Sequence, residues 1–452
     1  MRAPVLSAVA VALGMGGCEA EPDDTAPDRC RARCDDNLGQ TVVIQVPSER
    51  LDQPVTIELS PCVRDGYLPD GAPVVTVLSG SFKALITPVE RNDLAVESQS
   101  GFVALYPSFP LDQGDFVSAH AGDYRGSGAR LAAEATLQYA AGEREDTEGC
   151  TLGDRVESRL SAQPPWLLGQ SNGGNLAMAV LADEALDLPA ISGVTTYETP
   201  AAAQFVTVEV GSVRAPLPLY EPGSCAWNPS DGLICDLDYS HLRWAPKPLD
   251  EEGHHGVAYF DLDGDEDYDE EIDSAVWGVR PEVDGEQWII YSPPMTAALL
   301  ASGEDPEGML TLEESLDFWA YRDASRLVVQ AVARYPELPF VVLGTQEDHT
   351  LGIEDHAHIS GLAHALQQAG AAWVRVNPDR AYIEHLTGTK LDWQDNPANL
   401  PTVPGDPTMH MLPNAPSLGL HTRDYATSTL AELVERSWCG AWTDDLDHVL
   451  LP

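Results

Sequence analysis

The chain has 452 residues, 43% of them hydrophobic, which is enough for a sizeable core and excludes an intrinsically disordered protein. It carries 72 acidic against 25 basic residues, a formal charge of −47, which argues against nucleic acid or an anionic membrane surface as a partner. Acidity spread this widely solvates the surface and identifies no substrate.

The N-terminus is predicted to be a targeting segment. Residues 1–17 contain Arg2, a mainly apolar run and then small residues that precede Cys18. This resembles a bacterial lipoprotein signal, which implies a lipidated Cys18; ordinary signal-peptidase cleavage nearby is the alternative. Residues 18–37 are expected to be an acidic tether. The protein is therefore predicted to be exported, either anchored by lipid or secreted, and no later apolar stretch is long enough to cross a bilayer.

Export favours disulfide bonds between the cysteines. Of the eight cysteines, removing Cys18 leaves an odd number: Cys30, Cys34, Cys62, Cys150, Cys225, Cys235 and Cys439. Cys225 and Cys235 would close a short loop and are the easiest pair to propose. Cys30 or Cys34 would join the entry segment to Cys62. A zinc site is less favoured because Cys30 and Cys34 have no second close pair to complete it.

The folded domain is predicted from about residue 38 to the C-terminus, and it opens with strands. A nearly continuous apolar run at 73–78 is typical of a buried central strand, and it ends in Ser79-Gly80-Ser81-Phe82. The other early strands are expected at 41–46, 55–59 and 102–106. A crossover helix is expected at 86–97.

The most informative stretch is 164–181, which reads PPWLLGQSNGGNLAMAVL. A short apolar run leads into a Gly-rich turn with Ser171 at its apex, and a helix-like Ala/Leu/Met segment follows. Small residues two positions before and after Ser171 suit a sharp strand-to-helix turn, where side chains would collide with the neighbouring strand and helix. The turn exposes the Ser171 hydroxyl and aims the first N–H groups of the helix at the space beside it.

Gly169-Gln170-Ser171-Asn172-Gly173 resembles the G-x-S-x-G nucleophile elbow of the α/β-hydrolase superfamily. The resemblance implies an α/β fold, with a mainly parallel sheet flanked by helices. It also implies that Ser171 is the nucleophile of a Ser–acid–His triad and that the N–H of Asn172 forms half of an oxyanion hole. In the family the strand before position 79 commonly ends in His-Gly; here Ser79 replaces that histidine, and the backbone N–H of Ser81 or Phe82 is expected to supply the other half.

A second segment supports this resemblance. Residues 123–128 read DYRGSG and resemble the D-x-R-G-x-G segment found between the fourth strand and the elbow in many α/β-hydrolases, including proline iminopeptidase-like enzymes. Its role in the family is structural, and a polar turn with an Arg–Asp pair is the simpler interpretation. Two motifs in the expected order are more specific than either one alone.

After a further strand at 191–197, the alternation of strands and helices breaks down from about 200 to 303. The resembled family places a lid here, which would close over the serine and shape the substrate pocket. Inside it, 261–271 reads DLDGDEDYDEE and resembles a D-x-D-G-D calcium loop. The expected structural Ca²⁺ ligands are Asp261, Asp263, Asp265, Asp267 and Asp269. The loop departs from an EF-hand at Glu266 and Ile272, and a solvated acidic loop is the alternative.

The regular pattern resumes with a helical region at 312–334. Strands are then expected at 338–343 and 373–376, and helices at 359–368 and 425–438. The resembled family keeps its catalytic acid just after the first of these strands. Asp348 is preferred to Glu347 because Leu351 matches the apolar residue that usually follows the acid. His356 and His358 are expected on the surface near a helix start, rather than as metal ligands.

Two histidines are candidates for the triad base. His385 follows the last strand and comes after Asp348 in the order usual for the family, although 379–384 could start a helix that turns its imidazole elsewhere. His421 stands just before the closing helix, but it needs the Pro-rich stretch before it to fold back over the sheet. His385 is preferred and His421 is the alternative.

The sequence therefore predicts an exported serine hydrolase that cleaves an ester or a peptide bond of a small-molecule or peptide substrate through an acyl-enzyme, without an organic cofactor. A different class of function is a non-catalytic lipoprotein that keeps the hydrolase fold and binds through a calcium-loaded lid. The complete turn around Ser171 favours the enzyme.

Overall fold

The computed structural model describes most of the chain from residue 41 onward. The described residues are 41–61, 63, 71–80, 101–109, 125–211, 217, 219–248, 255–269, 271–276, 278–280, 282–283, 286–303, 306–346, 348, 351, 353, 355–389, 402–403, 406–412, 420, 422–440 and 442. The predicted signal peptide, the tether, Cys18, and the crossover helix at 86–97 lie outside them.

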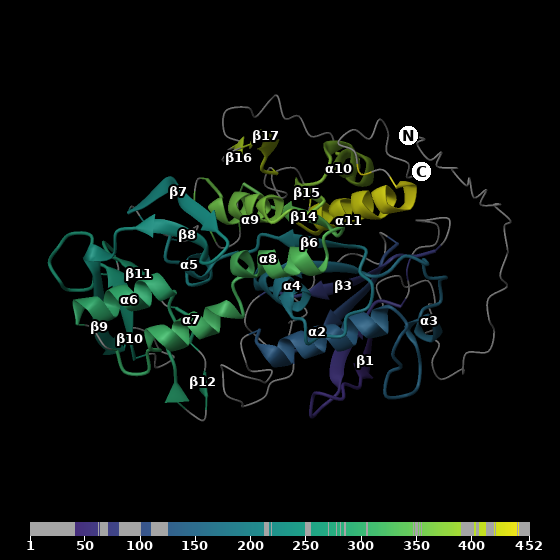
Figure 1. Ribbon diagram of the computed structural model, residues 1–452, viewed down its shortest axis with the longest axis horizontal. Coiled ribbons are helices and arrows are strands. Elements are labelled where there is room, and N and C mark those ends of the chain that lie inside the picture. Colours follow the sequence, from purple (N-terminus) through teal and green to yellow (C-terminus); the bar gives the residue numbers. More distant parts are fainter. Residues whose placement is uncertain are drawn as a thin grey trace, which may run out of the picture.

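An eight-stranded sheet with the order β1-β2-β4-β3-β5-β6-β14-β15 forms the centre of the molecule (Figure 1). β1 pairs with β2, and β2 with β4, antiparallel; the remaining pairs are parallel. The strands are β1 (Val42–Val46), β2 (Val55–Leu59), β3 (Val74–Leu78), β4 (Val103–Pro107), β5 (Trp166–Gln170), β6 (Gly193–Tyr197), β14 (Pro339–Leu343) and β15 (Trp373–Val376). Each lies where the sequence predicts a strand, so the predicted α/β class with a mainly parallel sheet is confirmed.

Helices cover both faces of this sheet because alternate side chains of each buried strand point to opposite sides. On β3, Val74 and Leu78 pack into the core shared with the helices of one face, whereas Val75 and Val77 pack into the core on the other. The first face carries α2 (Ser127–Ala140), α3 (Leu152–Arg155), α4 (Asn172–Ala182), α8 (Ala324–Arg334) and α9 (Ala357–Gln368). The second carries α10 (Arg380–Thr387) and α11 (Thr422–Cys439).

The segment between β6 and α7 (Leu312–Ala320) forms a separate lobe beside the sheet (Figure 1). It begins with α5 (Ala203–Val206) and ends with α6 (Pro293–Ser302). Between them lie a hairpin of β7 (Tyr220–Asn228) and β8 (Gly232–Leu237), a three-stranded sheet of β9 (Leu242–Pro248), β10 (His255–Phe260) and β11 (Ser274–Val276), and the short pair β12 (Glu282–Val283) and β13 (Glu286–Gln287). A further short pair, β16 (Thr402–Val403) and β17 (Asp406–His410), precedes α11.

The hairpin of β7 and β8 attaches this lobe to the core. Cys225 and Cys235 form a disulfide across it, and Trp227 donates its indole N–H to the carbonyl of Ser325 on α8 at 2.8 Å. The lobe is therefore tied to the helices of the first face.

Cys150 is also disulfide-bonded, and Cys439 is a free, exposed thiol.

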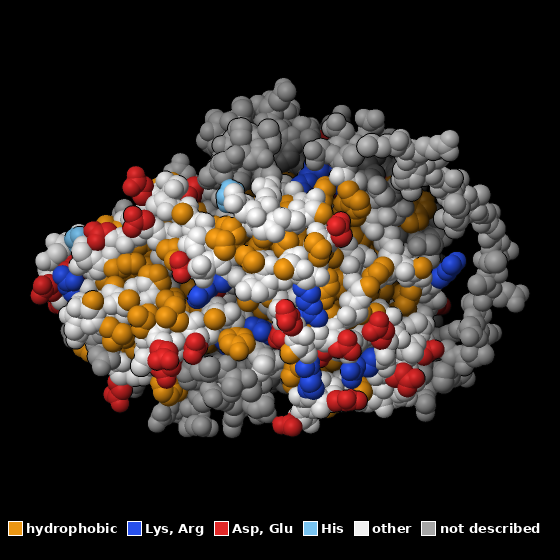
Figure 2. Space-filling model, viewed as in Figure 1, with side chains coloured by type: hydrophobic (Ala, Val, Ile, Leu, Met, Phe, Trp, Pro, Cys, Tyr) orange, Lys and Arg blue, Asp and Glu red, His pale blue; other side chains and the backbone are white. Residues whose placement is uncertain are grey.

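Charged side chains are scattered over the face in Figure 2, with acidic and basic groups interspersed across the core and the inserted lobe. Hydrophobic side chains gather over α6 and α7, where Leu300 and Leu316 are 39% and 40% exposed (Figure 2). In the part of the chain that the structure describes, no helix combines the length and the hydropathy that a membrane span requires.

Candidate active site

Ser171 occupies the turn between β5 and α4. Its backbone has φ 47° and ψ −124°, a combination that L-residues rarely adopt and that costs on the order of 1–3 kcal/mol. The Ser171 N–H donates to the carbonyl of Tyr197 on the next strand at 2.7 Å, and its own carbonyl accepts from Gly174 N–H at 2.9 Å. These contacts hold the strained turn at the carboxyl edge of the sheet.

The glycines around Ser171 are required by close contacts with neighbouring atoms. A Cβ added at Gly173 would lie 2.0 Å from the carbonyl oxygen of Leu78, at the end of β3. One added at Gly169 would lie 2.5 Å from the carbonyl oxygen of Gly173, and one at Gly174 would lie 1.8 Å from Oγ1 of Thr199. Strand, turn and helix therefore approach more closely than any side chain permits.

The loop after β3 lies against the Ser171 side chain. A Cβ added at Gly80 would be 2.9 Å from Cβ of Ser171 and 3.6 Å from its Oγ. Arg125, which is buried, holds this loop: its Nη2 donates to the carbonyl of Ser79 at 2.9 Å and to that of Gly80 at 2.8 Å. The arginine of the DYRGSG segment thus fixes the loop from which an oxyanion donor is expected.

The predicted oxyanion donors are placed only in part. Asn172 is the first residue of α4, where a helix leaves its N–H groups without intrahelical partners and concentrates positive potential. Ser81 and Phe82 lie outside the described residues, so their donor role stays a prediction. The hydroxyl of Ser171 has no hydrogen-bond partner among the residues that the structure describes.

Asp348 follows β14 and is buried, 3% exposed. Its Oδ1 accepts from the N–H of Leu351 at 2.8 Å, and its Oδ2 lies 3.0 Å from Nε2 of His358. Because β5 and β14 run in the same direction, Ser171 and Asp348 both follow carboxyl ends at one edge of the sheet. That placement fits the predicted acid, although among the described residues no base contacts both Asp348 and Ser171.

The triad base remains a prediction. His385 lies within α10, and a helix at this position was the argument against His385 as the base in the sequence analysis. Its side chain is not described. His421, the alternative, precedes α11 and lies outside the described residues. Neither assignment is tested by the structure.

The surface placement expected for His356 and His358 is wrong. His356 is 5% exposed and His358 is completely buried, at the start of α9. The imidazole of His358 packs edge-on against Phe205 of α5, with ring centroids 5.7 Å apart. The lobe that covers them is separated from α9 by a long stretch of sequence, so no local pattern indicated this burial.

Glu198 is a buried acidic residue at the same edge of the sheet, and the sequence analysis did not single it out. It follows β6 with a left-handed backbone, φ 42°, and is 3% exposed. Its Oε1 accepts from the hydroxyl of Tyr197 at 3.0 Å and from the hydroxyl of Thr345, which follows β14. The only signal in the sequence was an acidic residue immediately after the predicted strand at 191–197.

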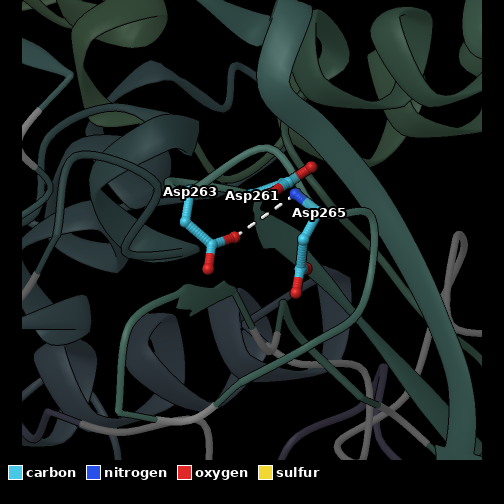
Figure 3. Close-up of side chains that lie close together, drawn as sticks. All are labelled: Asp261, Asp263 and Asp265. Carbon is cyan, nitrogen blue, oxygen red and sulfur yellow. Dashed lines mark hydrogen bonds between the residues drawn. The ribbon is translucent and has the colours of Figure 1, made fainter.

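The acidic loop lies in the inserted lobe, after β10. Asp261, Asp263 and Asp265 each offer a carboxylate oxygen, and these oxygens lie within 4.8 Å of one another (Figure 3). Asp261 is buried, and its two oxygens accept from the N–H groups of Gly264 and Glu266 at 2.7 and 3.2 Å. Among the described residues, Asp267 and Asp269 do not join this group, so three of the five expected ligands are brought together.

By sequence, no family model and no curated protein matches the chain. Solved structures with a similar arrangement include a lipase/esterase from Lactobacillus plantarum, which is 10% identical with a TM-score of 0.37 over 75% of this chain and 91% of that one. A carboxyl esterase 2 from Tuber melanosporum is 11% identical, with a TM-score of 0.37 over 77% and 80%. An esterase from Pyrobaculum calidifontis is 14% identical, with a TM-score of 0.35 over 75% and 76%.

Likenesses this distant carry no argument about this chain, and its fold is established from its own topology. The parallel sheet and the strand–turn–helix at Ser171 are observations on the chain itself. The chain has the α/β-hydrolase fold.

Proposed function

We propose that the protein is a serine hydrolase that cleaves an acyl ester or amide through an acyl-enzyme intermediate. The observation that carries this proposal is the strained backbone of Ser171 at the edge of the sheet, with Gly80 against its side chain and a helix beginning at the next residue. Strain of this kind persists only where the surrounding structure holds it, and it gathers at sites that position a reacting group.

In the proposed reaction, His385 or, alternatively, His421 removes the proton from Ser171 as its oxygen attacks the acyl carbon. Asp348 holds that histidine in the correct tautomer and stabilises the imidazolium that forms. The N–H of Asn172 and one from Ser81 or Phe82 stabilise the negative oxygen, and losing one such donor costs about 100- to 1000-fold in rate. The histidine then protonates the leaving group, and water releases the acyl group from Ser171.

A fluorophosphonate probe tests the proposal on the folded protein. Labelling of the wild type, with loss of labelling in Ser171→Ala, is the expected result. Absence of labelling in a wild type that melts cooperatively contradicts catalysis and favours the alternative, a non-catalytic calcium-binding lipoprotein. Turnover of acyl esters of varied chain length against aminoacyl amides then separates an esterase from a peptidase.

Separate alanine substitutions decide the base. We expect His385→Ala to lower the chemical step by several orders of magnitude while the protein stays folded. If His385→Ala keeps near wild-type turnover and His421→Ala abolishes it, His421 is the base.

We also propose export with lipidation at Cys18, and a structural Ca²⁺ held by Asp261, Asp263 and Asp265, with Asp267 and Asp269 as further candidates. The sequence pattern supports both, and the grouping of three carboxylates supports the second. Mass spectrometry of protein from membranes tests the first: a mature N-terminus at Cys18 carrying acyl chains is expected, and an unmodified cysteine contradicts it.

A further inference from the structure

Each of the two carboxylate oxygens of Asp348 has a hydrogen-bond partner. The N–H of Leu351 reaches Oδ1 from the loop at 2.8 Å, and His358 reaches Oδ2 from the first turn of α9 at 3.0 Å. Both side chains of the Asp348–His358 pair are buried, at 2% and 0% exposure. A carboxylate with two donors on different oxygens cannot rotate about its last torsion without losing one of them.

His358 is not placed to act on Ser171 itself. Its Nε2 is used by Asp348, and its Nδ1 is buried without a hydrogen-bond partner among the described residues. Phe205 packs against the ring, so this imidazole is enclosed by protein. The neutral tautomer with its proton on Nε2 donates to Asp348 and leaves Nδ1 as a bare acceptor, which costs less in a buried position than an N–H without an acceptor.

We propose that His358 is a positioning residue, which donates its Nε2–H to Asp348 and thereby sets both the orientation and the basicity of the catalytic carboxylate. The inference rests on the proposed function, in which Asp348 is the triad acid. It assigns to α9 a part in the chemistry that sequence reasoning assigned only to the loop before it.

Several other titratable groups lie around this pair. His356 is next to His358 on the same turn, with ring centroids 6.0 Å apart, and Asp355 accepts from the hydroxyl of Tyr220 of the inserted lobe at 2.9 Å. Glu198, which follows β6, accepts a hydrogen bond from Thr345, and Thr345 lies three residues before Asp348. Glu347 and His349 adjoin Asp348 in the sequence but lie outside the described residues. Each is present in every variant below, so their effects cancel in the comparison.

A donor to a carboxylate draws negative charge away from the oxygen that supports the triad base. If that donor is removed, the carboxylate becomes a stronger stabiliser of the imidazolium, and the pKa of the catalytic histidine rises. The acid limb of kcat/KM therefore moves to higher pH, by roughly 0.5 to 1 pH unit. Loss of orientation lowers kcat in addition, by about 10- to 100-fold, with KM little changed.

Two substitutions test the inference. His358→Gln carries an amide N–H₂ at about the distance of Nε2 and should keep both the acid limb and kcat near wild type. His358→Met fills a similar volume without a donor and should lower kcat and move the acid limb upward. Thermal melting and fluorophosphonate titration of each preparation count the folded, reactive protein, so rates are compared per active site.

Different outcomes separate this inference from the proposed function. If Ser171→Ala abolishes turnover and Asp348→Asn lowers it strongly, while His358→Met keeps the wild-type acid limb and kcat, His358 does not position the acid. If His358→Gln is as inactive as Ser171→Ala, the histidine itself is the base and the positioning role is wrong. If Asp348→Asn turns over like the wild type, Asp348 is not the triad acid, and the inference that His358 positions a catalytic carboxylate is wrong as well.

Discussion

Gly80 lies against the side chain of Ser171, the proposed nucleophile, and this close approach predicts the effect of adding a single methyl group. In Gly80→Ala the new Cβ would need the Ser79–Gly80 backbone, or Ser171, to move by a few tenths of an ångström. We expect kcat for an acyl ester to fall by about 10- to 100-fold, because a misplacement of ~1 Å at the reacting group costs about 100-fold.

The matched control for this substitution is Gly153→Ala in α3, where the nearest atom to a new Cβ is Oγ1 of Thr151 at an ordinary 3.8 Å. Turnover and thermal melting are measured for both variants. Wild-type kcat in a folded Gly80→Ala protein would show that the loop after β3 does not set the geometry at Ser171.

The burial of His356 makes the stability of the fold depend on pH. Burial, and then the neighbouring His358, lowers the pKa of His356 from 6.5 to about 4. Because the folded pKa lies below the unfolded one, the unfolded chain binds a proton first as the pH falls. The stability that the neutral imidazole contributes is present above pH 6.5 and is lost on acidification towards pH 4, by roughly 3 kcal/mol in all.

The variant His356→Asn isolates this effect, since asparagine tolerates the left-handed backbone at this position, φ 44°. We expect the free energy of urea unfolding to fall more steeply between about pH 7 and pH 4.5 in the wild type than in His356→Asn. Parallel pH profiles of stability for the two proteins would show that His356 does not cause the loss of stability on acidification.

At the scale of elements, Glu209 joins three parts of the inserted lobe. It is fully buried, and its Oε1 accepts from the Thr207 hydroxyl at 2.6 Å and the Ser292 N–H at 2.9 Å. Its Oε2 accepts from the Ser292 hydroxyl at 2.6 Å and the Tyr239 hydroxyl at 2.9 Å. Desolvation raises the pKa of this carboxyl group. The contacts connect α5, the turn before β9 and the start of α6.

Glu209→Gln keeps the shape of the side chain but turns one acceptor oxygen into a donor that faces donors. We expect a loss of about 1 to 3 kcal/mol in the stability of the lobe, because a buried polar group is then left unpaired. Hydrogen exchange should show faster opening of β7, β8 and α6 than of the central sheet. The exposed Glu221→Gln on β7 is the control; equal exchange in both variants would rule out the role of Glu209.

At the scale of the whole molecule, any salt should stabilise a protein with a formal charge of −47 by screening its repulsion, and this effect must be distinguished from specific binding of an ion. If the loop at Asp261, Asp263 and Asp265 binds Ca²⁺, the ion stabilises the folded state by about 2.7 kcal/mol at a concentration roughly 100 times its Kd. We expect a higher melting temperature with CaCl₂ than with NaCl of the same ionic strength, and no difference in Asp263→Asn/Asp265→Asn. Equal melting in the two salts, with no heat of binding by calorimetry, would show that the loop is only a solvated turn.

The sequence by itself determined the strands of the central sheet, their order along the chain, and several of the helices between them. Strands such as 73–78 and 338–343 are continuous or nearly continuous apolar runs, and the turn at Ser171 depends on adjacent glycines, so the information is local. Short-range sterics and hydrophobic patterning decide such features before distant parts of the chain meet. The place of Asp348 after β14 was also predictable, because the end of a strand can be counted along the chain; its role as the acid stays a proposal.

Only the tertiary structure decided which groups face one another at the edge of the sheet. His358 is buried because α5, which lies far earlier in the chain, packs over the start of α9. Glu198 and Thr345 meet because β6 and β14 are neighbours in the sheet, and Arg125 reaches the loop after β3 from the start of α2. Contacts of this kind depend on strand order and packing, which no local pattern specifies, and they set the environment in which the charged groups of the candidate site work.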